Sequence, residues 1–531
     1  MRREFILGSL FVVAVIALGG FFATWIYWLY LIVLPLILLG LIDFFQKRQS
    51  IRRNFPVLGR VRYIFEMIRP EINQYFVESN SDGVPFSREQ RSIVYQRAKN
   101  VLDTLPFGTQ KDVYETGYEW INHSIRPTHI ESEKLRLIIG NEQCSQPYNS
   151  SLFNISAMSY GALSKNAIMA LNGGAKDGGF AHNTGEGGVS SYHLKNGGDL
   201  IWQIGTGYFG CRMPDGTFDP VQFSERSQIE NVKMIEIKLS QGAKPGHGGI
   251  LPGKKVNAEI AQIRGVPEGK DVLSPPGHSA FSTPIEMMKF IAKLRELSNG
   301  KPIGFKLCLG KRREFFALAK AMRETKIYPD FITVDGGEGG TGAAPLEFSN
   351  SVGSPGVEGL IFVHNALVGL GIRQHMKIFS TGKVVTAFGL IKRIALGADA
   401  IYSARGMMLA LGCIQALRCN SNVCPAGVAT TDPNLYGGLH VGDKRRRVHS
   451  FHRETMNSVA EILGAMGLNG LEDLKPWHVV RRTEVNTTMH YAEMFEYIEP
   501  GALLQSSLPS SYKRAFSAAE SGSFNHVGTK A

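Results

Sequence analysis

The longest apolar segment of the chain lies at its N-terminus, where no residue between Phe5 and Ile42 is charged. One membrane helix needs about 20 apolar residues, and this segment is about twice that long. Aromatic residues gather in its middle, next to Gly19–Gly20: Phe21, Phe22, Trp25, Tyr27 and Trp28. Because such residues concentrate at membrane–water interfaces, the pattern predicts a transmembrane helical hairpin over residues 1–46, with its turn where the aromatic residues gather.

Basic residues flank the predicted hairpin on both sides. Arg2 and Arg3 precede it, and no acidic residue interrupts the basic residues that follow it: Lys47, Arg48, Arg52, Arg53, Arg60 and Arg62. By the positive-inside rule both ends are cytoplasmic, which predicts a two-pass protein of the cell membrane with its main body in the cytoplasm. The opening MRREFIL faintly resembles a twin-arginine export signal, but no small-x-small cleavage site follows the first apolar run. A buried hairpin of a soluble protein is a further alternative.

Short apolar runs alternate with helical patterns through residues 136–480, and this alternation indicates parallel strands joined by crossover helices. Helical patterns cover 283–297, 313–325 and 384–396. We expect eight strands, at 153–157, 179–184, 200–205, 233–240, 303–308, 331–336, 377–382 and 400–404. Eight such units over this length predict an α/β fold, a (β/α)8 TIM barrel, in place of an open sheet.

Two flanking regions complete the expected organisation. Residues 47–135 are mostly helical by pattern, with a helix beginning near Ser87, and we interpret them as a connector between hairpin and barrel. Residues 481–531 are rich in serine towards their end and predict a C-terminal extension that is partly disordered.

Composition and charge narrow the functional classes. The net charge is +12, yet no run of basic residues interleaved with aromatic residues occurs in the glycine-rich body, so we expect no nucleic-acid partner. The six cysteines do not form the pattern of an extracellular disulfide framework, which favours a reducing compartment.

Most candidate functional residues lie in the loops that follow the predicted strands, which is where a barrel places its functional loops. The loop HNTGEGG holds Glu186, and the loop SQGAKPGHGGILPGKK presents Gln241 and Lys244. Lys306 lies inside an apolar strand, where an ammonium group needs an anionic partner. A flavin ring that gathers negative charge on reduction and an ordinary ion pair with Asp or Glu both satisfy that need.

Glycine-rich turns at the ends of the last strands are typical phosphate sites, because backbone N–H groups and a helix N-terminus face the anion. The turns in VDGGEGGTGAAP and STGK precede the start of a helix at ARGMM. Candidate phosphate ligands are therefore Gly339, Gly340, Thr341, Gly382, Lys383 and Arg405. Glycine turns alone are a weak signal.

Half of the cysteines crowd into one segment, at Cys413, Cys419 and Cys424, with C-x5-C-x4-C spacing and a following proline. This spacing matches neither the C-x2-C pairs of zinc ribbons nor the ladder of small ferredoxins. Three thiolates can hold the three irons of a cuboidal cluster. The alternative is three core cysteines like Cys144, Cys211 and Cys308.

The segment CIQALRCNSNVCPAGVAT strongly resembles the 3Fe-4S segment of glutamate synthases. The resemblance continues through AMSYGALS, NTGEGG, GAKPGHGGILPGKKV, LSPPGHSAFST and GGTGAAP, and it covers roughly residues 150–470. The chain is most similar to the membrane-anchored FMN-binding glutamate synthase family proteins, which lack a glutaminase domain. The resemblance implies FMN, a 3Fe-4S cluster held by Cys413, Cys419 and Cys424, and reductive conversion of 2-oxoglutarate plus ammonia to glutamate.

The resemblance also implies roles for single residues. Glu186 matches an acidic residue beside the flavin, Gln241 and Lys244 match residues that hold 2-oxoglutarate or its imine, and Lys306 matches a lysine beside the flavin ring. Further flavin contacts are implied for Ala157, Ser159 and Gln203. The chain departs from the family at His247, where a glutamate is usual, and at Ile250, where a glutamine is usual. Its weaker phosphate turn shifts the expected phosphate contacts towards Lys383 and Arg405.

Three functions stay open at this stage. The first is a membrane-anchored glutamate synthase, supplied by a protein electron donor that is ferredoxin-like or a reductase subunit, because no dinucleotide fingerprint with its strand, helix and distal acid is found. The second is an FMN oxidoreductase of another amino or 2-oxo acid, such as one forming N-methylglutamate, and His247 and Ile250 favour it. The third is a membrane electron-transfer subunit. Membrane lipid is an expected partner in all three.

Overall fold

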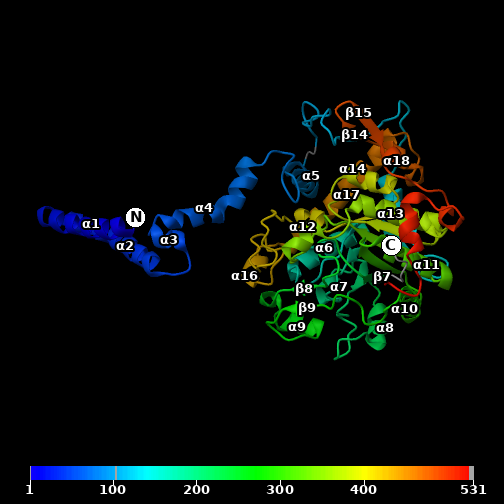
Figure 1. The fold of residues 1–531 in the computed structure, drawn as a ribbon, viewed down its shortest axis with the longest axis horizontal. Helices are drawn as coiled ribbons and strands as arrows, with labels where there is room; N and C mark the ends of the chain where they lie inside the picture. Colours follow the sequence, from blue (N-terminus) through cyan, green and yellow to red (C-terminus); the bar gives the residue numbers. More distant parts are fainter. Residues whose placement is uncertain (1, 102–103, 526–531) are drawn as a thin grey trace. The chain divides into compact units, whose positions relative to one another are not determined.

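The computed structural model describes residues 2–101 and 104–525. The chain divides into two compact units, residues 1–88 and 89–531, and each is described separately (Figure 1). The domain boundaries expected near residues 46, 135 and 480 stay predictions.

The first unit begins with two apolar helices. α1 (Arg2–Phe22) leads through a short 3-10 helix, η1 (Thr24–Leu29), into α2 (Tyr30–Phe45). Both apolar segments are long and apolar enough to cross a membrane. The two helices join at Ala23, within the cluster of aromatic residues where the turn is expected, whereas α1 continues through Gly19 and Gly20. The glycines serve packing instead, because a Cβ on Gly20 would lie 2.2 Å from the Tyr27 ring.

Further helices follow the hairpin in the first unit, and a loop over residues 78–87 follows them. α3 (Ser50–Asn54) and α4 (Gly59–Ile72) follow the hairpin, and a π-helical turn, η2 (Asn73–Val77), extends α4. The helix expected near Ser87 is α5 (Arg88–Lys99), which belongs to the second unit from Glu89 onwards.

The second unit is built on a closed barrel of eight parallel strands, which confirms the predicted fold class (Figure 1). Each expected strand is present, although most are shorter than predicted, and the strands follow one another around the barrel in chain order. Their bounds are β4 (Phe153–Ile155), β5 (His182–Asn183), β6 (Leu200–Ile204), β7 (Val232–Lys238), β10 (Ile303–Cys308), β11 (Phe331–Asp335), β12 (Lys377–Ser380) and β13 (Ala400–Ser403).

Helices surround the barrel and follow the strands as crossovers. The predicted helical spans appear as α10 (Pro284–Leu297), α11 (Arg312–Thr325) and α14 (Ala387–Ala395). The start of α10 is encoded locally, since Thr283 and Glu286 form a capping box and Pro284 occupies the first turn. The other helices of eight or more residues up to residue 465 are α6 (Lys165–Gly178), α8 (Pro220–Ser227), α13 (Gly356–Gly369) and α17 (Val441–Ala465).

Short helices and small sheets lie in the loops. The short helices are α7 (Ser191–Leu194), α9 (Ala258–Arg264), α12 (Leu346–Ser351), α15 (Arg405–Ala410) and α16 (Pro433–Tyr436). Two antiparallel pairs join β2 (Arg136–Ile139) to β3 (Tyr148–Ser151) and β8 (Ile250–Leu251) to β9 (Val272–Leu273). A third sheet combines β1 (Glu119–Ile121), β14 (Val479–Glu484) and β15 (Thr487–His490).

The predicted C-terminal extension contains ordered elements as far as it is described. α18 (Tyr491–Met494) and α19 (Ser510–Ser517) lie in it, and Lys320 of α11 donates hydrogen bonds to the carbonyls of Phe516 and Ala519. Residues 526–531 lie outside the described residues, so partial disorder stays a prediction.

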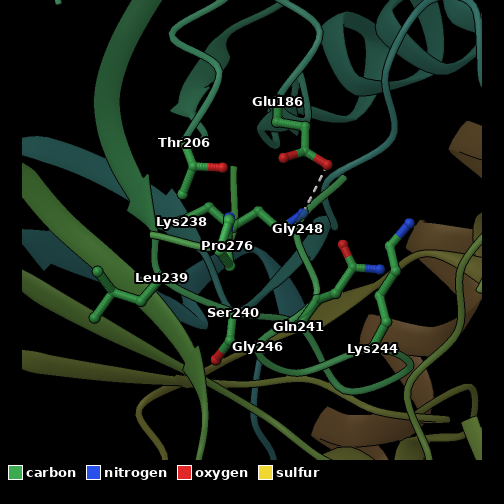
Figure 2. A pocket seen from close by; sticks show the side chains of 10 residues that line it. All are labelled: Glu186, Thr206, Lys238, Leu239, Ser240, Gln241, Lys244, Gly246, Gly248 and Pro276. Carbon is green, nitrogen blue, oxygen red and sulfur yellow. Dashed lines mark hydrogen bonds and ion pairs between the residues drawn. The ribbon is translucent and has the colours of Figure 1, made fainter. Parts of the chain in front are cut away.

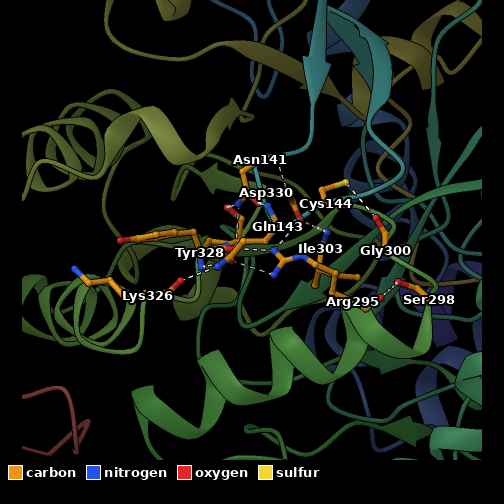
Figure 3. Close-up of polar contacts among 11 residues, drawn as sticks. Asn141, Gln143, Cys144, Arg295, Ser298, Gly300, Ile303, Lys326, Tyr328 and Asp330 are labelled. Carbon is orange, nitrogen blue, oxygen red and sulfur yellow. Dashed lines mark hydrogen bonds and ion pairs between the residues drawn. The ribbon is translucent and has the colours of Figure 1, made fainter.

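A buried ion pair between Arg295 and Asp330 lies at the end of the barrel where the strands begin (Figure 3). Asp330, just before β11, accepts hydrogen bonds from Arg295 at 2.9 Å and from the backbone N–H groups of Ile303 and Asn141 at 2.8 Å each. The carboxylate therefore joins the end of α10, the start of β10 and the turn after β2.

Replacing Asp330 with Ala is expected to lower the free energy of unfolding by about 3–5 kcal/mol, because the buried Arg295 guanidinium loses its counter-charge. Chemical denaturation of the detergent-solubilised protein measures this. The matched control is Glu131→Ala, which removes an exposed pair with Lys134 and should cost less than about 1 kcal/mol. Equal losses in the two variants would contradict the structural role of Asp330.

Candidate functional site

A pocket opens at the carboxyl ends of the barrel strands, between the loops that follow β5, β6 and β7 (Figure 2). Glu186, Gln241 and Lys244, predicted from two loops, all line it. The other lining residues are Thr206, Lys238, Leu239, Ser240, Gly246, Gly248 and Pro276. The structure thus brings the three predicted catalytic residues to one place, on the barrel face where functional loops gather.

Glu186 is held firmly in this pocket. Its Oε1 accepts a 2.7 Å hydrogen bond from Nζ of Lys238, the last residue of β7, and the carboxylate side chain is 18% exposed. A Cβ added at Gly205 or Gly249 would lie 2.5 or 2.6 Å from the carboxylate oxygens, so both loops need glycine to close around it.

The charges around Glu186 decide its ionisation. Burial opposes the charged form, but Lys238, Lys244 and Arg264 outweigh it, so the pKa of Glu186 lies below its usual value. The carboxylate is therefore ionised at neutral pH, inside a cationic environment.

Lys244 is a buried cation with an unusual pKa. Its Nζ donates a 2.8 Å hydrogen bond to the carbonyl of Ala343, in the loop after β11. Burial, reinforced by the charge of Lys238, lowers the pKa of Lys244 to about 8, although Glu186 acts in the opposite direction. The ammonium group therefore titrates close to physiological pH.

Arg264, at the end of α9, is a third cation beside this pocket that the sequence did not reveal. Its Nη2 donates hydrogen bonds to Ser159 Oγ at 3.3 Å and to the Tyr160 carbonyl at 3.1 Å. Among the described residues, its buried Nε has no hydrogen-bond partner. Burial lowers the pKa of Arg264 to about 10, against the attraction of Glu186. An anionic ligand in the pocket would offset the cost of burying this group.

The barrel interior below the pocket carries a second polar cluster. Glu236 of β7 is fully buried and accepts hydrogen bonds from Asn183, Gln203 and Thr333 at 2.6–2.8 Å. The amide nitrogen of Gln203 is thus committed to Glu236, and its contact with FMN stays a prediction.

Lys306 forms an ion pair with a carboxylate, which is one of the two anionic partners expected for it. Its Nζ lies 3.1 Å from Oδ2 of Asp335, the last residue of β11. Burial acts to lower the pKa of Lys306, but Asp335 and Glu236 raise it above its usual value. Lys306 therefore stays protonated whether or not a flavin lies beside it.

The residues predicted to bind phosphate meet where β11, β12 and β13 end. A Cβ on Gly340 would lie 2.7 Å from Arg405 Nε, and one on Gly382 would lie 3.3 Å from Glu338 Oε1. Gly339 and Thr341 belong to the same β11 loop as Gly340.

The cations of this region suit an anion. Burial, and then the charge of Arg405, lowers the pKa of Lys383, and burial also lowers the pKa of Arg405. The nearby Glu338 carboxylate is already bonded to Arg393 at 3.0 Å and to the backbone of Gly356 at 2.9 Å. Lys383, which is exposed, and Arg405, which is half-buried, repel each other and together fit the phosphate group of a mononucleotide.

The three clustered cysteines lie within range of one another's charges. Burial, with a smaller contribution from the charges of Cys419 and Cys424, raises the pKa of Cys413 to about 12. Among the described residues, no group of three or more His, Cys, Asp or Glu side chains could hold a single metal ion. A three-iron cluster asks for a different arrangement, because each thiolate binds its own iron. Bound metal keeps such thiols deprotonated.

A buried lysine links this cysteine segment to the barrel. Lys255 donates hydrogen bonds to the carbonyls of Ala429, just after Cys424, and of Ala162, in the loop after β4, at 2.9 and 3.0 Å. The loop after β4 also carries Ala157 and Ser159, so the predicted cluster segment and the predicted flavin contacts share one anchor.

The two positions that depart from the family pattern lie on the loop after β7. His247 packs edge to face on Phe348, with 5.2 Å between ring centroids, and its buried Nδ1 lacks a hydrogen-bond partner within the described part of the chain. Ile250 begins β8 and pairs with Leu273.

A family model, described as the conserved region in glutamate synthase, matches residues 109–469, more than half of the chain. The chain belongs to the glutamate synthase family. This membership confirms the resemblance seen in the sequence and places the chain among oxidoreductases of the glutamate synthase type.

Relatives of this glutamate synthase family chain differ in how much of it they share. The glutamate synthase large subunit-like protein YerD of Bacillus subtilis is 39% identical over 498 residues, covering 86% of this chain and 94% of YerD. An archaeal glutamate synthase (NADPH) of Methanocaldococcus jannaschii is 33% identical over 360 residues, covering 67% of this chain and 66% of the relative. The flavin-binding domain of baker's yeast flavocytochrome b2 aligns with a TM-score of 0.42 at 11% identity, over 84% of this chain and 95% of that domain. A structural similarity at that level carries no further conclusion.

Sequence reasoning missed Lys238, Glu236 and Arg264 in this glutamate synthase family chain. The first two stand in the run MIEIK of a predicted strand, and charged residues inside an apolar run carry the signal that drew attention to Lys306. Arg264 gave no such signal, because it lies in an ordinary helix and reaches the pocket only through the fold.

Proposed function

We propose that this chain catalyses the glutamate synthase reaction, in which 2-oxoglutarate, ammonia, two electrons and two protons give glutamate and water. One observation carries the proposal: Glu186 lies with Lys238 and Lys244 in one pocket at the carboxyl ends of the strands, within range of the charge of Arg264. A cationic pocket with one ionised acid suits a dicarboxylate and an incoming amine.

We propose that the flavin that the family implies binds next to this pocket. The proposed FMN contacts are Ala157, Ser159, Gln203 and Lys306, with the phosphate near Gly339, Gly340, Thr341, Gly382, Lys383 and Arg405. The chemistry that FMN would supply there is hydride delivery to the carbon of 2-iminoglutarate.

The residues of the chain bind and orient the reactants in this proposal. Lys244 pairs with a carboxylate of 2-oxoglutarate, and Gln241 donates a hydrogen bond to the same end of the molecule. The Glu186 carboxylate accepts hydrogen bonds from ammonia and fixes its approach to the keto carbon, which is the positioning on which an addition step depends.

We also propose that Cys413, Cys419 and Cys424 hold a 3Fe-4S cluster, whose contribution would be single-electron transfer from a protein donor that is ferredoxin-like or a reductase subunit. The apolar hairpin α1–α2 is proposed to anchor the chain as a two-pass protein of the cell membrane, with the barrel in the cytoplasm. Its length, its composition and the flanking basic residues support this.

Turnover should depend on pH through Lys244. Its pKa of about 8 lies below the usual value, so the charge is present below pH 8 and is lost above it. We expect kcat/KM for 2-oxoglutarate to fall about tenfold per pH unit on the alkaline side. Lys244→Arg keeps its charge and should flatten this limb. An unchanged alkaline limb in Lys244→Arg would contradict the assignment.

Product analysis separates the proposed substrate from the main alternative. His247 and Ile250 replace residues that are polar in the family, which favours a bulkier amine as the second candidate. The reduced protein is supplied with 2-oxoglutarate and either ammonia or methylamine, and the products are identified by mass spectrometry. Preferential glutamate formation supports the proposal, whereas preferential N-methylglutamate formation moves the chain to the second class.

A further inference from the structure

An exposed apolar stripe runs along α4 and its extension η2, outside the catalytic unit. Its members recur at helical spacing, and each is at least 40% exposed: Leu58, Val61, Ile64, Phe65, Ile72 and Phe76. An apolar stripe of this kind normally packs against another surface, so its exposure requires an explanation.

Basic residues accompany the stripe. Seven basic residues and one acidic residue occupy positions 46–69. Arg62 and Arg69 lie at one edge of the stripe by helical spacing, where their aliphatic stems can lie along an apolar phase while the charges reach phosphate groups. An apolar face bordered by basic residues is typical of helices that lie in the interface of an anionic membrane.

A buried acid ties α4 to the end of the proposed membrane span. Asp43, near the end of α2, is fully buried and accepts hydrogen bonds from Arg52 of α3 at 2.6 and 2.9 Å and from Arg60 of α4 at 2.7 and 2.9 Å. The backbone N–H of Val57 also donates to Asp43, at 3.2 Å. The first turn of α4 is therefore fixed beside the point where α2 would leave the bilayer.

We propose that α4 lies along the cytoplasmic surface of the membrane, with its apolar stripe in the acyl–headgroup boundary and its basic edge on anionic lipid. The proposal rests on the proposed hairpin anchor and extends it, since a helix held at the end of a membrane span begins at headgroup depth. At about 1.5 Å per residue, the 14 residues of α4 cover about 21 Å of that surface.

Site-specific photocrosslinking tests this placement in the full-length protein. p-Benzoylphenylalanine is placed at Phe65 or at Met67, and the protein is reconstituted into vesicles of phosphatidylcholine and phosphatidylglycerol. Both residues are 60% exposed, yet they point about 200° apart around the helix. After irradiation, mass spectrometry identifies the adducts. We expect about tenfold more lipid adduct at Phe65 than at Met67.

A third position separates the possible failures. The same probe at Leu18, which is exposed near the end of α1, reports on the hairpin itself. Lipid adducts at Leu18 with equal yields at Phe65 and Met67 would overturn the placement of α4 and leave the anchor standing. Adducts of Phe65 with another part of this chain, or with a second copy, would also overturn it. No lipid adduct at Leu18 would remove the anchor, and the placement with it, without bearing on glutamate formation.

Discussion

Replacing Glu186 with Gln is expected to lower the rate of glutamate formation by about 100- to 10,000-fold. The substitution keeps the size of the side chain but removes the negative charge that fixes the amine. It also leaves the Lys238 ammonium, now 2.7 Å from Glu186 Oε1, without its counter-charge. The measurement is the rate at which the dithionite-reduced protein forms glutamate from saturating 2-oxoglutarate and ammonia.

The matched control for this prediction is Glu259→Gln. Glu259 accepts a 2.6 Å hydrogen bond from the Tyr160 hydroxyl and does not line the pocket. Its replacement should leave the rate unchanged. A Glu186→Gln protein with normal flavin content and a nearly normal rate would remove Glu186 from the proposed chemistry.

Replacing Cys424 with Ser is expected to abolish turnover driven by a protein electron donor while leaving the substrate half-reaction intact. A serine hydroxyl is a poor substitute for a thiolate on iron, so the cluster should be lost together with its low-temperature EPR signal and its iron. Dithionite still reduces the flavin directly, so flavin reoxidation by 2-oxoglutarate and ammonia should proceed at the normal rate. Iron analysis, EPR and the two rates together measure this prediction.

Cys144→Ser is the control for the cysteine experiment. Cys144 is also a free thiol, and it donates to the Gly300 carbonyl at the opposite end of the barrel from the cysteine segment. It should retain iron and donor-driven turnover. If Cys424→Ser kept its full iron content and its EPR signal, the three-cysteine ligand set would be wrong.

The barrel was predictable from the sequence because its signals are local. Parallel strands buried on both faces form short apolar runs, such as LIWQI in β6, and helices between them carry their own start signals, such as the Thr283–Glu286 capping box. The turn of the hairpin was predictable from its clustered aromatic residues, whereas Gly20 serves close packing against the Tyr27 ring.

The candidate site was predictable only in part. Glu186, Gln241 and Lys244 stand out because they interrupt glycine-rich loops. The residues that surround them do not stand out. Lys238 and Arg264 act on Glu186 although both are far from it in the chain. For Lys306, the sequence left a carboxylate and a flavin ring as equal alternatives. A lysine inside an apolar strand indicates an anionic partner but does not identify it, and the structure shows Asp335.

Anaerobic single turnover of the detergent-solubilised protein tests the central claim most directly. The protein is reduced with dithionite, 2-oxoglutarate and ammonia are added, and flavin reoxidation is followed together with glutamate formation. The proposed function predicts one glutamate for each flavin reoxidised. A flavin that stays reduced, in protein containing both FMN and the iron–sulfur cluster, would contradict it and favour another substrate or an electron-transfer role.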